Sequence, residues 1–108
     1  MNRHRLAEER SLALHRAIAA RLAADSGVLE RARGRVRLWL EAGEVAAYYA
    51  REWEAVLSRP VAEICAFLTD ESEHARSLRQ VTPFAGVIDP RTRWRIWREV
   101  REDLDGPG

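Results

Sequence analysis

A chain of 108 residues, of which 46% are hydrophobic, is long enough for one hydrophobic core and too short for two independently folding domains. Its single cysteine, Cys65, excludes an internal disulfide and with it the class of small secreted proteins held together by disulfides. The net charge of +1 gives no reason to expect nucleic acid or an anionic membrane as the main partner.

The N-terminal residues and the hydropathy pattern predict a soluble protein of the cytoplasm. Residues 3–9 are largely charged where a signal peptide would become apolar, and no run approaches the roughly 18 apolar residues of a membrane span. All 18 basic residues are arginine, and seventeen positions are alanine. Because a GC-rich coding sequence produces this composition, the number of arginines is not in itself evidence for phosphate binding.

The first half of the chain predicts three helices. Residues 5–24 contain no proline or glycine, and a second helix follows a cap at Asp25 or Ser26 and ends at Gly43. The third helix is expected over residues 44–57. On each helix a stripe of apolar and small residues recurs mainly at spacings of three or four positions and so lies on one side. These stripes are Ala7, Ser11, Leu14, Ile18 and Leu22; Leu29, Ala32, Val36, Trp39 and Leu40; and Val45, Tyr49, Trp53 and Val56.

The second half predicts three further helices. Pro60 suits the first turn of a short, largely buried helix. Asp70 and Glu73 have the spacing of a capping box that opens a brief helix through about residue 80. Asp89 and Pro90 supply a cap and a first turn for the last helix, and residues 105–108 are expected to fray. The inward side of the last helix consists of Ile96, Trp97, Val100 and Leu104.

These patterns together define the fold class. No segment alternates between apolar and polar residues over the length of a strand, so we expect no sheet. We predict an all-α fold, a compact single-domain bundle of five to six short helices over residues 1–104. Leu12 and Leu38 point away from the stripes of their own helices and face a neighbouring helix, solvent or another chain. The predicted core consists of Leu14, Ile18, Leu22, Val36, Trp39, Tyr49, Trp53, Val56, Ile64, Phe67, Leu68 and Val100.

The sequence predicts neither a metal site nor a catalytic site. His4 and His15 share a side of one helix, but they lie roughly 16 Å apart along it, too far to hold one ion. Glu71 and His74 have the Glu-x-x-His spacing of di-iron bundles, without the second copy that such sites need. Cys65 has apolar neighbours and resembles a small core residue more than a nucleophile. Because phosphate loops, dinucleotide fingerprints and nucleophile motifs are also missing, we expect no cofactor and no enzyme activity.

The connection over residues 82–88 is the most unusual segment. Pro83 and Gly86 oppose a helix, yet four of the seven residues are apolar. Two interpretations are open. Either the loop folds back so that Phe84, Val87 and Ile88 close the end of the bundle, or it presents them as an exposed patch that binds a partner.

Two tryptophans on the following helix favour a partner. Trp94 lies at the edge of the inward stripe and is therefore hard to bury fully, whereas Trp97 belongs to the stripe. Tryptophan, phenylalanine and arginine are the residues that anchor protein interfaces. We predict a non-catalytic interaction module that binds another protein or a second copy of this chain. The candidate partner-binding residues are Phe84, Val87, Ile88, Trp94 and Trp97.

A DNA-binding regulator is the alternative from a different class. The first helix has the strongest local excess of positive charge, and arginines are dense at the centre of the second. Arg31 and Arg35 flank one edge of that helix's apolar stripe and Arg33 and Arg37 the other, which suits side chains lying over the core. Salt separates the hypotheses, because binding to phosphate weakens steeply with ionic strength. The candidate residues are Arg3, Arg5, Arg10, Arg33 and Arg37.

Residues 75–94, from Ala75 to Trp94, together with residues 9–15, carry a resemblance to known sequences. In these stretches the chain is similar to a set of small, Arg- and Ala-rich bacterial helical proteins without an assigned function. Some of those proteins resemble the antitoxin-like partner of a two-gene toxin–antitoxin module. The resemblance implies a bacterial source, a helical fold and a protein partner, and it assigns no role to any single residue.

Overall fold

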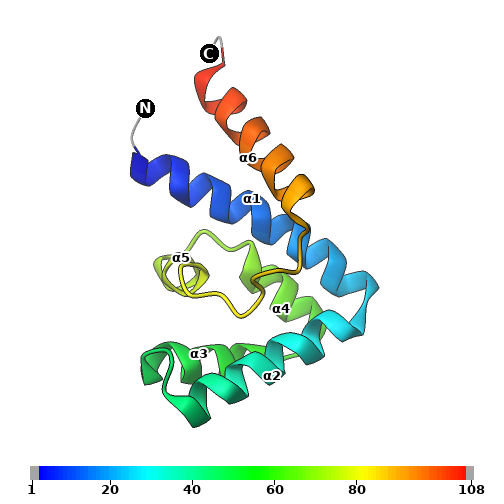
Figure 1. The fold of residues 1–108 in the computed structure, drawn as a ribbon, viewed down its shortest axis with the longest axis vertical. Coiled ribbons are helices and arrows are strands. Elements are labelled where there is room, and N and C mark those ends of the chain that lie inside the picture. The colour runs from blue at the N-terminus through cyan, green and yellow to red at the C-terminus, as the bar shows by residue number, and fades with distance from the viewer. Residues whose placement is uncertain (1–2, 107–108) are drawn as a thin grey trace.

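The computed structural model describes residues 3–106, which form six helices and, within that range, no strand (Figure 1). The structure confirms the all-α prediction. The helices are α1 (Arg3–Ala24), α2 (Ser26–Ala42), α3 (Ala47–Leu57), α4 (Val61–Leu68), α5 (Glu73–Arg79) and α6 (Pro90–Asp105). Asp105, predicted to belong to a frayed tail, closes α6, and residues 107–108 lie outside the described part.

Helix α1 contacts more helices than any other helix in the described residues. It contacts α2, α4, α5 and α6, while α2 pairs with α3, and α3, α4 and α5 contact one another. Figure 1 shows α2 and α3 at one end of the molecule, which measures 47 × 28 × 24 Å, and α6 at the other end beyond α1. Among the helices in residues 3–106, α6 contacts α1 alone.

The helix ends follow the local chemistry that the sequence predicts, with three exceptions. Pro60, predicted in the first turn of α4, is its N-cap residue instead. The Asp25 carboxylate accepts the Gly27 N–H at 2.8 Å, and Gly43 ends α2 with a φ of 68°, a conformation that favours glycine. The predicted cap of α5 is wrong, because Ser72 Oγ, and not Asp70, accepts an N–H there. Helix α3 begins three residues later than predicted, at Ala47, and its N-cap residue Ala46 makes no side-chain cap hydrogen bond.

Trp53 lies at the centre of the core. Its ring makes edge-to-face contacts with Phe67 and Phe84, with centroid distances of 5.9 and 6.0 Å. The indole N–H donates to the carbonyl oxygens of Leu78 at 3.2 Å and Val81 at 2.6 Å. Because a buried N–H without a partner would be costly, these bonds fix α3 against the C-terminal end of α5.

Nine of the twelve predicted core residues are buried, so the helical stripes place most of the core correctly. Leu14 and Tyr49 are only half-buried against it, and Val100, half-buried on α6, lies outside the core cluster. On α1 the predicted stripe is partly wrong, because Leu12 and His15 are buried in place of residues 7 and 11. The reason is that α4 and α5 cover one side of α1 and α6 only lies along another.

The connection between α5 and α6 is tied to the core by polar contacts. Thr82 Oγ1 accepts the Phe84 N–H at 3.2 Å, and the Val87 N–H returns to the Phe84 carbonyl at 3.2 Å. Gly86, with a φ of 87°, occupies the third position of this turn, where a type II turn requires a positive φ. Arg35 donates to the Ala85 carbonyl at 3.0 Å from α2. The start of α6 is therefore fixed in place.

Candidate functional site

The structure decides between the two interpretations of the connection. Phe84 is 1% exposed against Trp53, and Ile88 is also buried, so the interpretation of an exposed patch is wrong for these two side chains. Val87 is half-buried against the core. The physical reason is that the turn at Phe84 folds the apolar side chains inward onto the ring of Trp53. A partner meets Phe84 and Ile88 only if the core opens.

Helix α6 is the least covered of the six helices in the described part of the chain. Although it is 16 residues long and has an apolar stripe, none of its residues is buried. Its stripe residues are half-buried on α1, and Trp94 is 65% exposed. The half-buried side chains are Thr92, Arg93, Ile96, Trp97, Val100 and Leu104. A shallow groove of about 180 Å³ lies between α1 and the C-terminal half of α6.

Trp97 joins α6 to α1 through stacked guanidinium groups. The guanidinium carbons of Arg10, from α1, and Arg93, from α6, each lie 5.4 Å from the ring centroid of Trp97. The Nε atom of Arg10 is buried and has no hydrogen-bond partner, so the aromatic ring is the group that holds this side chain. Trp97 therefore supports the α1–α6 contact, and only part of it is available to a partner.

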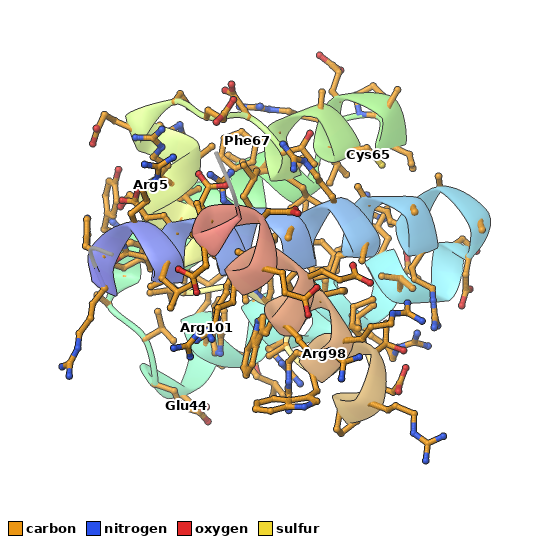
Figure 2. The ribbon with its side chains drawn as sticks, turned by 90° about the horizontal axis from the view of Figure 1, so that it is seen from above. Arg5, Glu44, Cys65, Phe67, Arg98 and Arg101 are labelled. Carbon is orange, nitrogen blue, oxygen red and sulfur yellow. The ribbon has the colours of Figure 1, made fainter. Side chains whose placement is uncertain are left out.

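The exposed side of α6 has a defined composition. Positions 94, 98, 101 and 105 are spaced four, three and four residues apart and so share one side of the helix. In Figure 2, Arg98 and Arg101 lie across α1 from Cys65 and Phe67 of α4. We call this surface the α6 face, and it consists of Trp94, Trp97, Arg98, Arg101 and Asp105.

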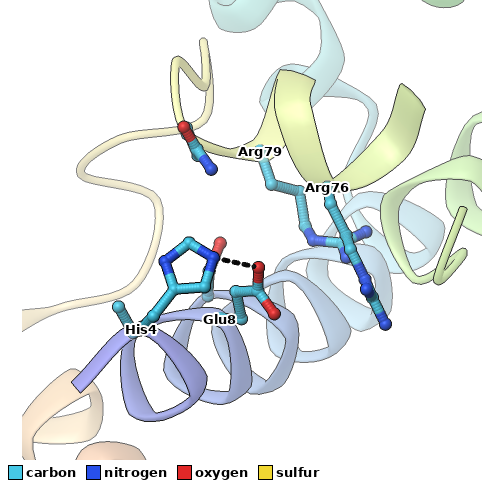
Figure 3. Close-up of a pocket in the computed structure, with 7 residues that line it drawn as sticks. His4, Glu8, Arg76 and Arg79 are labelled. Atoms are coloured by element: carbon cyan, nitrogen blue, oxygen red, sulfur yellow. Dashed lines mark ion pairs between the residues drawn. The ribbon is translucent and has the colours of Figure 1, made fainter. Parts of the chain in front are cut away.

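A second hollow region lies between α1 and α5 (Figure 3). Its volume is about 280 Å³, and its walls include the ion pair of His4 and Glu8, at 3.0 Å, and the side chains of Arg76 and Arg79. An adjoining hollow of about 320 Å³ extends past Arg79 toward Trp97. Ala7, Ser11 and Arg79 line both hollows.

Arg79 is a buried arginine whose partners are backbone carbonyls. It is 5% exposed, and its Nη1 donates to Asp70 O at 2.6 Å and to Leu68 O at 3.3 Å. Among the described residues, no carboxylate oxygen lies within 4 Å of its guanidinium, and burial lowers its pKa. These bonds fasten α5 to the preceding turn, which makes Arg79 a structural residue.

His15 lies next to this arginine and is buried as well. Its Nδ1–H donates to Ser11 O at 2.7 Å, which leaves Nε2 to accept the Thr82 hydroxyl at 3.0 Å. Burial, and to a smaller extent the charge of Arg79, lowers the pKa of His15 to about 4. At neutral pH the ring is uncharged and both nitrogens are engaged, so it is not available as a general base.

The arginines of the DNA-binding alternative do not form one surface. Arg33 donates Nε and Nη2 to Leu57 O at 3.1 and 2.8 Å, and Arg10 stacks on Trp97. Arg3 and Arg5 are exposed on the first turns of α1, near the C-terminal end of α6, while α2 lies with α3 at the other end of the molecule (Figure 1). The structure therefore brings none of the α1 candidates to Arg33 and Arg37.

The remaining candidates for chemistry have ordinary structural partners. His74 pairs with Glu52 at 2.8 Å and packs edge-on against Phe67. Cys65 donates to Ala19 O at 3.5 Å, and burial raises the pKa of its thiol. Within residues 3–106, no three His, Cys, Asp or Glu side chains gather as metal ligands would. Nor does any helix in this range have the length and hydropathy to cross a membrane.

Comparisons with known proteins add no assignment to this geometry. No family model matches the chain, and neither curated proteins nor solved structures gave a significant match.

Sequence reasoning missed the buried pair of His15 and Arg79. For His15 a signal was present, because Leu12, His15, Ile18 and Leu22 are themselves spaced as a helical stripe. Arg79 gave no such signal. Its burial depends on the carbonyls that the turn after α4 directs toward it, which no local pattern encodes.

Proposed function

We propose that the chain is a non-catalytic protein-interaction module that binds a helical segment of its partner on the α6 face. The observation that carries the proposal is that α6 contacts one helix only and leaves Trp94 65% exposed. An exposed tryptophan surrounded by arginines is the composition of interface hot spots. The ring of Trp94 is thus available for contact with a partner, whereas Phe84 and Ile88 are buried.

An antitoxin-like protein, which acts by covering a second protein, is one instance of this function. The resemblance of residues 75–94 to small bacterial helical proteins supports that instance, because α6 begins within this stretch. The single cysteine suits a reducing compartment, and we therefore place the interaction in the cytoplasm.

The test is affinity purification of the tagged chain from its own host after nuclease treatment, with washes at low and high salt. Three forms are compared: the unmodified chain, Trp94→Ala, and Tyr48→Ala as a matched control. Tyr48 is also an exposed aromatic residue, at 56%, but it lies on α3. We expect one protein to be retained stoichiometrically at high salt by the unmodified chain and by Tyr48→Ala, and lost with Trp94→Ala.

Two results would overturn the proposal. Retention of the same protein by Trp94→Ala would remove the α6 face from the interaction. Retention of nucleic acid alone, at low salt only, would favour the DNA-binding alternative. In that case reversing the charge of Arg33 and Arg37 should abolish nucleic-acid retention.

A further inference from the structure

The two adjoining hollows beside α1 have the size of a binding site for a small molecule. Their volumes are about 280 and 320 Å³, and they share three lining residues, Ala7, Ser11 and Arg79. Ligand pockets in proteins have volumes from about 300 Å³ upward. Figure 3 shows that the side chains of Arg76 and Arg79 extend from α5 toward α1 in the first hollow. A small organic molecule would therefore meet both guanidinium groups.

Arg79 has an unused edge besides the bonds that fasten α5. Both of its hydrogen bonds start from Nη1, so within residues 3–106 its Nε and Nη2 donate to no acceptor. In the same range Arg10 Nε is the buried side-chain nitrogen without a partner, so Nε and Nη2 of Arg79 are not closed off. Since the residue is only 5% exposed, the surface left to these two nitrogens faces the hollows that it lines.

The walls of the hollows carry more positive than negative charge. Arg10, Arg76 and Arg79 line them, against one carboxylate, that of Glu8, which pairs with His4 at 3.0 Å. Among the described residues none of these arginines has a carboxylate oxygen within 4 Å. A buried charge without a counter-ion is costly. An anion that enters the hollows would therefore be stabilised.

The second hollow adds apolar surface to this charge. Leu14 and Trp97 line it together with Ala7. An inorganic anion such as phosphate would leave this surface unused, and its second negative charge would be repelled by the Glu8 carboxylate in the first hollow. A singly charged anion with an apolar body makes use of both parts of the site.

We infer that the two hollows bind a small carboxylic acid with an apolar body, in its carboxylate form. The Nε and Nη2 hydrogens of Arg79 leave one edge of the guanidinium group in parallel, which is the geometry that holds both oxygens of a carboxylate. The hydroxyl of Ser11, which lines both hollows, is a further donor, and the apolar body lies against Leu14 and Trp97. Binding here does not depend on the partner that we propose for the α6 face.

The experiment is an NMR titration of the isotope-labelled full chain with hydrocinnamate, a carboxylate joined to an apolar ring. Hydrocinnamamide keeps the shape without the charge, and inorganic phosphate keeps a charge without the apolar body. For a probe of this size we expect a dissociation constant of about 0.1–1 mM. The other two probes should bind at least about tenfold more weakly. The indole N–H signal of Trp97 should shift with the same dissociation constant, because Trp97 lines the site.

Ala7→Leu tests the location of the site. Ala7 is an exposed residue of α1 that lines both hollows, and leucine is a good helix former, so the larger side chain should fill the site without unfolding the helix. Hydrocinnamate binding should weaken at least about tenfold. Ala20→Leu is the matched control, because it makes the same change at an exposed position of α1 outside both hollows. It should leave binding unchanged.

Arg79→Lys tests the recognition of the carboxylate. Lysine keeps the positive charge and a donor for the Asp70 carbonyl but lacks the two parallel N–H groups, so binding should weaken about tenfold. Thermal denaturation of each variant shows whether it is folded. If Arg79→Lys unfolds, Ala7→Leu still decides the outcome.

Four results would overturn the inference. Hydrocinnamate that gives no saturable shift, or that binds Ala7→Leu as well as the unmodified chain, removes the site. Hydrocinnamamide or phosphate that binds as tightly as hydrocinnamate removes the proposed class of ligand. None of these results bears on the proposed function, because retention of a protein through Trp94 is measured separately.

Discussion

Helices α4 and α6 are both amphipathic, but they differ in how much of their apolar stripe is covered. Helix α4 has eight residues, contacts three other helices and buries Ile64, Phe67 and Leu68. Helix α6 is twice as long, contacts α1 alone and buries none of its residues. The difference shows that burial in this small protein depends on the number of neighbours a helix has, and not on the strength of its own pattern.

The same contrast holds for aromatic residues only ten positions apart. Phe84, at the end of the connection, lies against Trp53 in the centre of the core, whereas Trp94 projects from α6 into solvent. We expect the core around Trp53 to determine folding and the α6 face to determine binding. Phe84→Ala tests the folding side of this division, and Trp94→Ala tests the binding side.

The largest effect is expected for Phe84→Ala. Removing this buried ring leaves a cavity beside Trp53, and we expect the free energy of unfolding to fall by about 3–5 kcal/mol. Urea denaturation followed by Trp fluorescence would measure the loss. A change below about 1 kcal/mol would mean that the connection does not close the core as described.

The next largest effect is a dependence of stability on pH through His15. Burial lowers its pKa from 6.5 to about 4, so the unfolded chain binds a proton at a higher pH than the folded one. Stability should be complete above pH 7 and decline as the pH falls from 6.5 to 4, by about 2 kcal/mol at pH 5.

Denaturation curves at pH 7.5 and pH 5 test this expectation, with two substitutions as controls. His15→Asn keeps a donor near Ser11 O and should remove most of the decline, at some loss of stability at neutral pH. His74→Asn, at an exposed histidine, should keep the decline. Equal stability of the unmodified chain at both pH values would contradict a buried, neutral His15.

A smaller effect of opposite sign is expected at Gly34, in the middle of α2. No heavy atom lies within 4 Å of the position that a Cβ would take, so Gly34→Ala should stabilise the chain by about 0.5–1 kcal/mol. Gly43→Ala is the contrasting control, because the positive φ of Gly43 makes the same change unfavourable. Hydrogen exchange should show no added protection of α6 in Gly34→Ala if α6 opens locally.

The smallest effect on stability is expected for Trp94→Ala. Because Trp94 is largely in solvent, the free energy of unfolding of the monomer should change by less than about 0.5 kcal/mol, while association through the α6 face is lost. Urea curves of the isolated chain would measure the first quantity. A loss of 2 kcal/mol or more would place Trp94 in the core and remove the division between folding and binding.

The sequence predicts the helices and most of the core because both depend on local spacing. Residues such as Trp53 and Ile64 combine a stripe position with an apolar side chain, and the structure buries them. The stripe on α6 has the same spacing, but nothing local shows that only α1 would cover it, so Val100 was expected in the core. Spacing reports which side of a helix faces inward, and it does not report how many elements meet that side.

The candidate site could be predicted only in part for the same reason. The exposure of Trp94 could be predicted from its position at the edge of the apolar stripe of its helix. The burial of Phe84 and Ile88 could not, because it depends on the direction in which the connection folds. That direction is set by long-range contacts, such as Arg35 with the Ala85 carbonyl and Trp53 with the Val81 carbonyl. Such contacts join residues distant in sequence, and no periodicity encodes them.

The fixed start of α6 has a consequence for how this protein tolerates mutation. Thr82, Phe84 and Gly86 determine where the helix leaves the core, and none of them belongs to the α6 face. We therefore expect substitutions at positions 94, 98, 101 and 105 to have little effect on folding, and substitutions at the turn to destabilise the chain. Relatives of this chain should share the turn and the aromatic cluster around it, and diverge in partner choice along the outer side of their last helix.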